Sequence, residues 1–217
     1  MSDLEDLRQK LFVALLSDSL DSVGLTHQAL PARIRPLDAS LKMLGRARTG
    51  VFMDVYGVRA DENPYELEIA LIDSLRPGEI AVLTCGASGR IAPWGELLST
   101  AAEARGAAGA LTDGYVRDIS GIIAMRFPVF HGGIAPLDSK GRGRLMAIDV
   151  PVECAGVRVA PGDLVMGDAD GVVVVPQAVE AEVMAAALAK RTAERSTLGD
   201  LRRGLLLRDV YEKYGVL

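Results

Sequence analysis

One stretch near the middle of the chain constrains the fold most, because it alternates strand, glycine-rich turn, helix and strand. The apolar residues 79–84 predict a strand, and the glycine-rich residues 86–89 turn the chain after it. Residues 93–105, opened by a proline, predict a helix, and residues 109–112 predict another buried strand. Adjacent strand ends in an α/β sheet bring their loops to one rim, where ligands usually bind. This stretch therefore predicts both the fold class and the edge that carries a site.

The rest of the chain extends this pattern and then changes character. The spacing of apolar residues predicts helices at residues 3–17 and 62–75. A strand is predicted at residues 47–55, and a short helix begins at Asp118. Further strands are predicted at residues 128–130, 147–153, 157–159, 164–166 and 172–175, and helices at 177–197 and around 210–214. No linker or low-complexity segment interrupts the sequence. We therefore expect residues 1–217 to form a single α/β domain with a mixed sheet and with N- and C-terminal helices.

Composition excludes several classes of protein. The 24 Lys and Arg residues against 29 Asp and Glu residues give a net charge of -5, which argues against nucleic-acid binding. No run of 18 apolar residues occurs, so no membrane span is expected although 49% of the residues are hydrophobic. We expect part of this apolar excess at subunit interfaces, mainly near residues 177–197 and the glycine-rich turn. The acidic start and only 2 cysteines predict a cytoplasmic protein.

The helix after the glycine-rich turn offers a site for a small anion. The first backbone N–H groups of a helix have no partner within that helix, and they attract carboxylate or phosphate groups. Here these are the amides of Glu96, Leu97 and Leu98. The alternative interpretation is a tight turn without any ligand. The turn lacks the Gly-Lys-Ser/Thr sequence of a nucleotide-binding loop and the glycine spacing of a dinucleotide-binding loop.

Arg117 and Asp118 follow the second strand of this stretch. Neighbouring side chains in an extended segment point in opposite directions, so the two need not simply pair with each other. Arg117 can clamp a carboxylate, and Asp118 can offer a hard oxygen to a divalent cation. The alternative is a solvated arginine beside an aspartate that caps the next helix.

Taken together, these pieces resemble the regulator-of-ribonuclease-activity A family, or RraA-like family. The resemblance is carried by Trp94-Gly95-Glu96-Leu97-Leu98, by the twenty residues between Glu96 and Arg117-Asp118, and by Gly167 to Pro176. It extends roughly from the first helix to Tyr214-Gly215-Val216-Leu217. The family includes divalent-metal aldolases for 4-hydroxy-4-methyl-2-oxoglutarate and 4-carboxy-4-hydroxy-2-oxoadipate. It implies an α/β/α sandwich with a mixed sheet and a swivelling-domain-like core, assembled as trimers or hexamers with active sites between subunits.

The resemblance also implies roles for individual residues. Asp118 would bind Mg²⁺ or Mn²⁺ directly, and Arg117 would contact the substrate. The segment from Gly95 to Leu98 would bind the pyruvate half of the substrate, whose carboxylate the amides of Leu97 and Leu98 would hold. Glu96 would hold water bound to the metal, although the aldolases usually have aspartate at this position. A further acidic residue reaches that water from a neighbouring subunit, and Glu194 matches it best by position.

These roles agree with the chemistry of a metal-dependent aldolase that releases pyruvate. A 2-oxo acid can chelate a divalent ion, which stabilises the enolate formed when the C3–C4 bond breaks. The stretch from Thr84 to Ile119 has no histidine, so metal-bound water oriented by Glu96 is the expected base. Oxaloacetate could lose CO₂ through the same enolate. Arg90 and the basic, glycine-rich segment of residues 136–144 are candidates for contact with the distal end of an anionic substrate.

Other functions remain as alternatives. The family also contains a regulator that acts by contacting a ribonuclease, and some members have been labelled methyltransferases. A methyltransferase would need an adenosylmethionine site, but the sequence shows no glycine motif paired with an acidic ribose partner. An aldolase that forms a Schiff base needs a buried lysine, and none of the 5 lysines lies in a continuous apolar strand. The two histidines, His27 and His131, are too isolated in sequence to suggest a metal site.

Overall fold

The computed structural model describes residues 2–215, and an 8-stranded mixed sheet forms its centre. Its strands are β1 (Arg35–Pro36), β2 (Met43–Asp54), β3 (Glu79–Thr84), β4 (Gly109–Thr112), β6 (Val129–His131), β8 (Gly143–Ile148), β11 (Leu164–Asp168) and β12 (Gly171–Val175). They follow the spatial order β1-β6-β4-β3-β2-β11-β12, with β8 paired to β2. Strands β2, β3, β4 and β6 run parallel, whereas β1, β8, β11 and β12 make antiparallel pairs. The predicted mixed sheet is confirmed.

The sheet curves until its two ends almost meet. The segment before β1 runs beside β12, because the Leu30 amide donates to the Val172 carbonyl at 2.9 Å. The Val174 amide donates in turn to the Gln28 carbonyl at 3.0 Å. These bonds occupy backbone groups that an open edge strand would leave unpaired. The result is a nearly closed sheet with its own interior.

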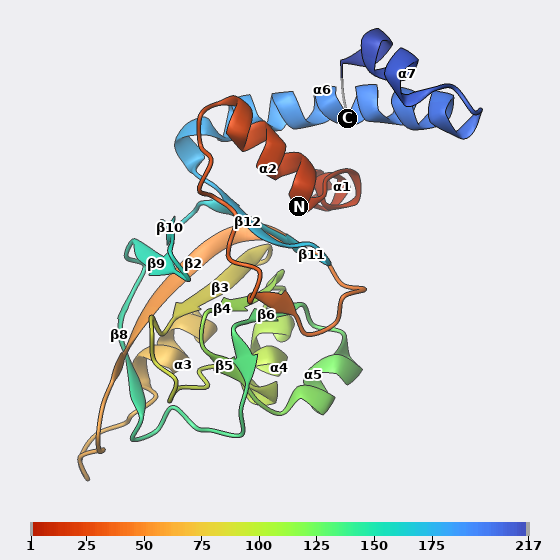
Figure 1. Cartoon of the computed structure of the whole chain (residues 1–217). Coiled ribbons are helices and arrows are strands. Elements are labelled where there is room, and N and C mark those ends of the chain that lie inside the picture. The colour runs from red at the N-terminus through yellow and green to blue at the C-terminus, as the bar shows by residue number, and fades with distance from the viewer. Residues whose placement is uncertain (1, 216–217) are drawn as a thin grey trace.

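Helices cover the sheet on two sides (Figure 1). On one side lie α3 (Glu66–Asp73), α4 (Glu96–Ala104) and α5 (Ile119–Met125). On the other lie α1 (Ser2–Lys10), α2 (Val13–Ser22) and α6 (Glu180–Arg202), which follows a short 3-10 turn η1 (Gln177–Val179). Two small two-stranded sheets complete the fold, β9 (Val152–Cys154) with β10 (Val157–Val159), and β5 (Tyr115–Val116) with β7 (Gly133–Ile134). The predicted α/β/α arrangement is confirmed.

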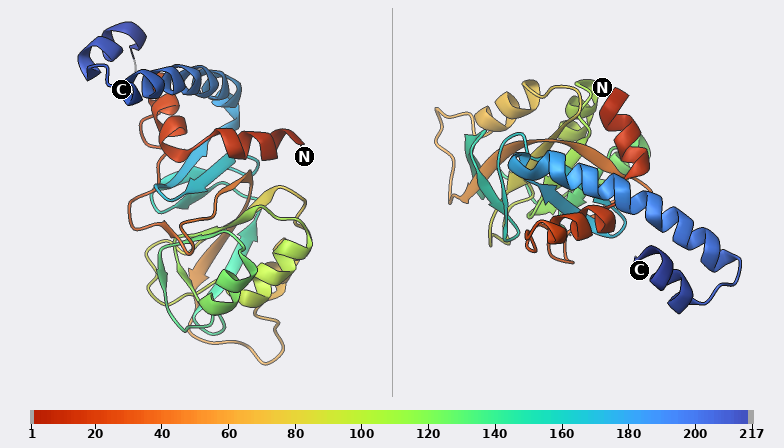
Figure 2. Two further views of the ribbon diagram at one scale, coloured as in Figure 1. Left: turned by 90° about the vertical axis from the view of Figure 1, so that its right-hand side faces the viewer. Right: turned by 90° about the horizontal axis from the view of Figure 1, so that it is seen from above.

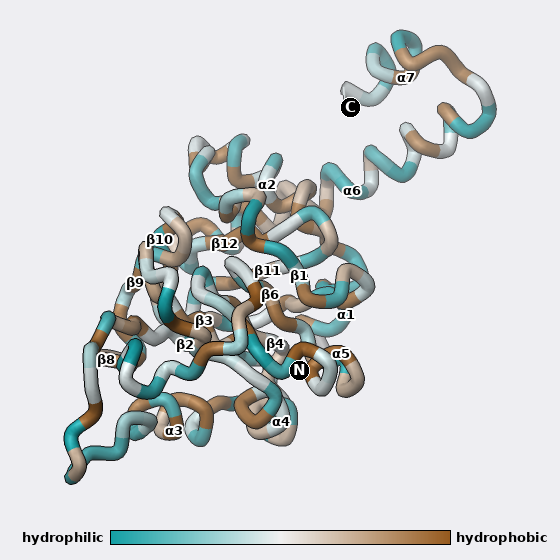
Figure 3. The backbone as a smooth tube through the Cα atoms, turned by 60° about the horizontal axis from the view of Figure 1, so that its bottom comes forward, coloured by the Kyte–Doolittle hydropathy of each residue, from teal (hydrophilic) through white to brown (hydrophobic). Residues whose placement is uncertain are grey.

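The C-terminal part of α6 extends beyond the sheet together with the last helix, α7 (Leu207–Tyr214), as Figure 2 shows. Asp200, buried in this arm, receives hydrogen bonds from Lys213 at 2.9 Å and from Tyr214 at 3.0 Å. These contacts fold α7 back onto the end of α6. Apolar side chains remain exposed along the arm, and Figure 3 shows the hydrophobic connection between the two helices.

Three groups of buried side chains hold the layers together. One lies between the sheet and α3, α4 and α5, and it contains Trp94, Phe127 and Leu83. A second fills the interior of the curved sheet beneath β9 and β10. The third joins α2 and α6 to β11 and β12. Burying such side chains contributes about 25 cal/mol for each Å² of apolar surface removed from water, so these contacts dominate the stability of the layers.

Two elements that were predicted as continuous are each divided in the structure. Residues 3–17 do not form one helix, because the chain breaks at Leu11 and Phe12 and a second helix begins at Val13. The buried carboxylate of Asp168 accepts a hydrogen bond from the Val13 amide at 2.9 Å and so stabilises that new helix start. Residues 147–153 are not one strand either, because Asp149 has a left-handed φ of 55° that separates β8 from β9.

Within residues 2–215, no helix is long and apolar enough to cross a membrane. Val216 and Leu217, the end of the segment on which the family resemblance drew, lie outside the described residues.

The role of Asp168 gives a test of how the N-terminal helices are held. Asp168→Ala removes the acceptor for the Val13 amide at 2.9 Å and for the Asp170 amide at 2.9 Å. We expect the free energy of unfolding to fall by about 2 kcal/mol, because a buried donor is left without a partner. Urea unfolding measures this change. In the exposed control Asp170→Ala, the free energy of unfolding should stay within about 0.5 kcal/mol of the wild-type value. An equal loss in both variants would contradict the stabilising role of the Asp168 carboxylate.

Candidate active site

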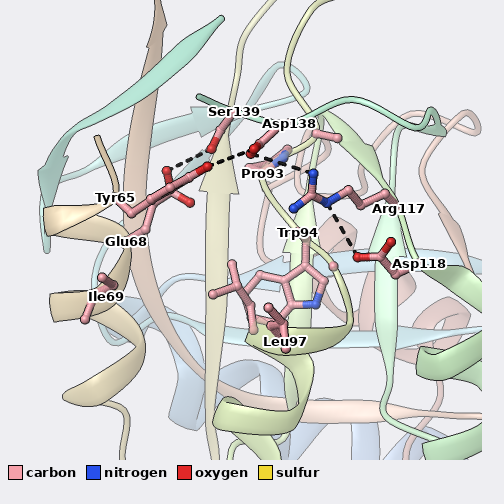
Figure 4. Close-up of a pocket in the computed structure, with 13 residues that line it drawn as sticks. Tyr65, Glu68, Ile69, Pro93, Trp94, Leu97, Arg117, Asp118, Asp138 and Ser139 are labelled. Carbon is pink, nitrogen blue, oxygen red and sulfur yellow. Dashed lines mark hydrogen bonds and ion pairs between the residues drawn. The ribbon is translucent and has the colours of Figure 1, made fainter. Parts of the chain in front are cut away.

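A cavity of about 320 Å³ opens at the carboxyl ends of β3 and β4, the rim that the sequence predicts. Residues from four parts of the chain line it: the start of α3, the segment that leads into α4 with its first turn, the loop after β5 and the loop after β7 (Figure 4). They are Tyr65, Glu68, Ile69, Ala92, Pro93, Trp94, Gly95, Leu97, Leu98, Arg117, Asp118, Asp138 and Ser139. The cavity therefore combines an apolar floor with a row of ionisable side chains.

A short parallel backbone pairing brings the two predicted halves of the site together. Trp94 forms a bridge with Val116, and the Arg117 amide donates to the Trp94 carbonyl at 3.0 Å. Trp94 itself is buried and donates from its indole Nε1 to the Ser99 hydroxyl at 2.8 Å, which fixes it to the first turn of α4. The start of α4 and the Arg117-Asp118 pair consequently face the same space.

Gly95 is required by this close approach. A Cβ atom at position 95 would lie 2.8 Å from Asp118 Oδ2 and 3.3 Å from Arg117 Cγ. The first of these distances is shorter than carbon and oxygen atoms tolerate, so a larger residue would displace the Asp118 carboxylate. The φ of Gly95 is -157°, an extended conformation that any residue can adopt. The close approach of Asp118 and Arg117 is therefore the reason for glycine at this position.

The N-terminus of α4 lies at the cavity with its first amides available. Gly95 is the N-cap residue, and within the described chain no side chain caps this helix. Leu97 and Leu98 line the cavity, and the first amides of a helix have no intrahelical acceptor. The partial positive charge of the helix N-terminus favours an anion at this place. The predicted carboxylate-binding position is thus part of the cavity wall.

Asp118 occupies a strained backbone position. Its φ of 56° and ψ of 36° are left-handed, which costs energy for a residue that has a Cβ atom. Asp118 is the N-cap of α5, but its side chain makes no capping hydrogen bond. The carboxylate therefore remains free to act in the cavity, contrary to the alternative in which it serves as a cap.

Arg117 lies between two carboxylates without being held tightly by either. Its Nε is 3.5 Å from Asp118 Oδ2, and one terminal nitrogen is 3.7 Å from Asp138 Oδ1. The same nitrogen donates to the Leu137 carbonyl at 3.3 Å. Ion-paired hydrogen bonds are usually about 2.7–2.9 Å long. The guanidinium is positioned by its neighbours and still has donors for a substrate carboxylate.

Asp138 and Tyr65 form the far side of this row. The Tyr65 hydroxyl donates to Asp138 Oδ2 at 2.8 Å. Burial, together with this bond to Asp138, raises the pKa of Tyr65 to about 12. Burial acts to raise the pKa of Asp138 too, but hydrogen bonds from Tyr65 and the Lys140 amide and the charge of Arg117 bring it below its ordinary value. Asp138 is therefore a fixed anion and Tyr65 a fixed donor at neutral pH.

Glu68 is the buried carboxyl group of the cavity. It lies on α3, is 5% exposed, and accepts a hydrogen bond from the Ser139 hydroxyl at 3.1 Å. Burial raises its pKa from 4.5 to about 7, although the bond from Ser139 and the charge of Arg117 act in the opposite direction. Glu68 therefore exchanges a proton in the neutral pH range, which ordinary glutamates do not do.

The remaining predicted residues lie around the cavity or away from it. Glu96 is exposed and does not line the cavity; its carboxylate lies against Gly121 in the first turn of α5. Arg90 stacks on the Tyr56 ring at 4.3 Å and lies 4.0 Å from Asp54. Glu194 lies on α6, on the opposite side of the sheet (Figure 1). Any contact of Glu194 with an active site would therefore be made in a neighbouring subunit.

Four residues of the cavity were not predicted individually from the sequence: Tyr65, Glu68, Asp138 and Ser139. One signal was available, because Glu68 precedes Leu71 by three and Leu75 by seven residues and so shares the apolar face of α3. A charged residue on a buried helix face is uncommon and often functional. Asp138 and Ser139 come from the glycine-rich segment 136–144, so this segment lines the cavity, and its contact with a substrate stays a prediction.

The comparisons with known proteins agree with this geometry. The model of the RraA-like family, described as Aldolase/RraA, matches residues 13–174. The chain belongs to this family. A Halalkalibacterium halodurans protein, provisionally named 4-hydroxy-4-methyl-2-oxoglutarate aldolase, is 35% identical over 181 residues, which span 83% of this chain and 80% of the relative.

Solved structures share this fold. An uncharacterized protein from Pseudomonas syringae pv. tomato superposes with a TM-score of 0.87 at 30% identity, covering 99% of this chain and 95% of that one. RraAS2 from Streptomyces coelicolor, described as an unusual member of the RNase ES inhibitor RraA family, gives a TM-score of 0.77 at 29% identity. The alignment covers 89% of this chain and 94% of RraAS2. The family thus contains proteins named as aldolases and proteins named as ribonuclease inhibitors.

The carboxyl groups of the cavity can be compared with the ligands that a divalent cation requires. Among residues 2–215, no three His, Cys, Asp or Glu side chains come together as a complete metal-binding group. Mg²⁺, however, usually binds through one or two carboxylates and completes its shell with waters and substrate oxygens. Arg117 is the one cation among the described residues that line the cavity, beside the carboxyl groups of Glu68, Asp118 and Asp138. A divalent cation on the free Asp118 carboxylate would balance this charge.

The pKa of Glu68 predicts how stability depends on pH. A glutamate ionises at 4.5 in the unfolded chain but at about 7 in the folded one, so the folded state holds an extra proton between these values. The stability that Glu68 contributes is therefore present below pH 4.5 and is lost as pH rises through 7. The difference in free energy of unfolding between Glu68→Gln and wild type should therefore shift in favour of Glu68→Gln by up to about 3 kcal/mol as the pH rises from acidic to mildly alkaline.

Urea unfolding of both proteins at a series of pH values measures this difference. Glu66→Gln, an exposed change on the same helix, is the matched control and should follow wild type at every pH. A constant difference between Glu68→Gln and wild type across the series would show that Glu68 is ionised at neutral pH in the folded chain.

Proposed function

We propose that this protein is a divalent-metal-dependent aldolase that cleaves a 4-hydroxy-2-oxo acid and releases pyruvate. The observation that carries the proposal is the cavity in which Arg117, the free Asp118 carboxylate and the N-terminus of α4 face one space. The provisional name of the H. halodurans relative supports the same reaction class. Substrates of the 4-hydroxy-4-methyl-2-oxoglutarate or 4-carboxy-4-hydroxy-2-oxoadipate type are the first to test, and oxaloacetate decarboxylation is a second activity of the same enolate chemistry.

The pyruvate half of the substrate would be held by groups of one chain. The amides of Leu97 and Leu98 would bind the carboxylate, because a helix N-terminus offers both donors and positive potential. Arg117, which is not held tightly by Asp118 or Asp138, would add its charge beside the same carboxylate and the 2-oxo group. Trp94 and Ile69 would exclude water from the bond that breaks. This arrangement would favour the enolate over the intact substrate, because the negative charge that develops on the 2-oxo oxygen would meet donors that are already in place.

The metal would be Mg²⁺ or Mn²⁺ held by Asp118. When bound, it would supply Lewis-acid stabilisation of negative charge on the 2-oxo oxygen. The 4-hydroxyl group must lose a proton as the C3–C4 bond breaks. Glu96, and Glu194 from a neighbouring subunit, are the carboxylates that we propose to orient the water that accepts this proton.

We also propose that the chain assembles into a trimer or hexamer with active sites between subunits. Large apolar side chains are exposed on the arm formed by the end of α6 and by α7, with Leu206 the most exposed at 70%. They are Leu198, Leu205, Leu206, Leu207 and Tyr211. Side chains of this size gathered in one place are typical of a surface that is covered in an assembly.

A second candidate function is regulation of a ribonuclease. It is favoured by the likeness to RraAS2, which is described as an unusual member of the RNase ES inhibitor RraA family. A regulator acts through its outer surface and has no requirement for a strained, uncapped aspartate inside a cavity. Association with a ribonuclease, without metal binding or pyruvate release, would establish this function in place of the aldolase.

The aldolase proposal predicts that Asp118→Asn removes metal-dependent pyruvate release. The substitution keeps the size of the side chain and removes the charge that would hold the cation. Pyruvate released from 4-hydroxy-4-methyl-2-oxoglutarate, followed with lactate dehydrogenase, should fall about 100-fold or more. A chelator should abolish the wild-type activity, and added Mg²⁺ or Mn²⁺ should restore it.

Asp21→Asn is the matched control, because Asp21 is an exposed aspartate at the end of α2, remote from the cavity. It should retain wild-type activity and metal dependence. Full activity of Asp118→Asn, or equal wild-type activity after chelation, would refute the metal-dependent mechanism.

The assembly proposal predicts a solution mass of three or six times the 23.0 kDa of one chain. Light scattering coupled to size exclusion gives this mass directly. Leu206→Glu places a charge on the exposed arm and should reduce the mass, whereas Tyr56→Glu, at an exposed aromatic residue outside the arm, should leave it unchanged. A wild-type mass of 23.0 kDa would overturn the proposal.

A further inference from the structure

The proposed reaction leaves one proton transfer without an assigned group. After the C3–C4 bond breaks, its electron pair lies in the enolate of pyruvate, and a proton must be added at C3 to give the methyl group. Carbon protonation needs an acid close to the bound enolate that is protonated near neutral pH. The water that we propose to accept the first proton would lie near Asp118. No proton donor is yet assigned on the opposite wall of the cavity.

The groups of the cavity differ sharply in whether they can supply this proton. Arg117 does not release its protons in a protein, and the pKa of Tyr65 is raised to about 12 by burial. Asp138 is kept ionised, because hydrogen bonds and Arg117 lower its pKa against the effect of burial. Asp118 is the proposed metal ligand. Among the described residues that line the cavity, this leaves Glu68.

Glu68 is also placed where such an acid is needed. It projects from α3 into the wall opposite Asp118, as Figure 4 shows, and Ser139 donates to its Oε1 at 3.1 Å. This bond fixes the carboxyl group and leaves the other oxygen without a further side-chain partner in the described chain. The charges of Asp138 and Arg117 affect the pKa of Glu68. The charge of Glu68 in turn affects the pKa values of Tyr65 and Cys85.

We propose that Glu68 is the catalytic acid that protonates C3 of the pyruvate enolate in this cavity. The inference rests on the proposed function, since it assigns a step of that reaction. Glu68 combines burial in the cavity wall, a fixed orientation through Ser139 and a position across the cavity from Asp118. Its protonated form also places no additional negative charge beside an anionic substrate.

The step balances without an oxidant or another reactant. The electron pair at C3 takes the proton of the Glu68 carboxyl group, a C–H bond forms, and Glu68 becomes a carboxylate. The proton released from the 4-hydroxyl group in the preceding step returns to Glu68 through solvent. The net change moves one proton from oxygen to carbon, as cleavage to pyruvate requires. In the reverse direction, Glu68 as a carboxylate removes a proton from the methyl group of pyruvate.

That reverse step provides the test, because it can be observed without the aldol substrate. Metal-loaded wild type, Glu68→Gln and Glu68→Asp are incubated with pyruvate in D₂O, and loss of the methyl signal is followed by proton NMR. We expect Glu68→Gln to slow exchange about 100-fold or more and to remove the step in its pH profile near 7. Glu68→Asp, which keeps the acid, should recover part of the rate. The KM for pyruvate should change little in Glu68→Gln, since the group is not proposed to bind the carboxylate.

Glu66→Gln, the exposed change on the same helix, should exchange deuterium at the wild-type rate. The pH dependence of unfolding shows independently that Glu68→Gln is folded and has lost the titration. If wild type releases pyruvate from a 4-hydroxy-2-oxo acid and Glu68→Gln exchanges within about twofold of wild type, the role of Glu68 is wrong and the aldolase stands. Wild type that neither releases pyruvate nor exchanges deuterium would overturn the aldolase and the role of Glu68 together.

Discussion

The parallel pairing of β3 with β4, continued by the bridge between Trp94 and Val116, determines most of what the cavity contains. Parallel strands end at the same edge of a sheet, so the segments after them meet there. The bridge then aligns the first turn of α4 with Arg117 and Asp118, and the glycine at position 95 lets their atoms approach. Without that register, the helix amides, the guanidinium and the carboxylate would face different spaces.

Charge is the second constraint on the site. One arginine stands beside three carboxyl groups in the cavity, which we propose to bind an anion, and the net charge of the chain is -5. Two features reduce this conflict. Burial keeps Glu68 largely protonated up to about pH 7, and the free Asp118 carboxylate can hold a divalent cation. The surroundings thus give similar side chains different charge states, on which the distinct roles that we propose for them depend.

The cavity and the exposed apolar arm are separate surfaces of one chain. The cavity lies on the side of the sheet covered by α3, α4 and α5, whereas the arm of α6 and α7 projects from the opposite side. A family that includes proteins named as aldolases and as ribonuclease inhibitors can vary the two independently, because function resides in sites rather than in the fold. The exposed leucines of the arm form the surface that we propose to be covered in the assembly.

The sequence alone determined the strands at 79–84 and 109–112, the rim where they end, and the Arg117-Asp118 pair, because strong apolar runs and glycine positions are local signals. The family followed from the same residues. Only the tertiary structure decided that α2 begins at Val13, where Asp168 supplies an acceptor from 155 residues away. Likewise, only packing placed Glu68, Tyr65 and Asp138 around Arg117. Burial and neighbouring charges set the acid–base behaviour of these groups, and both depend on contacts between segments that are distant in the sequence.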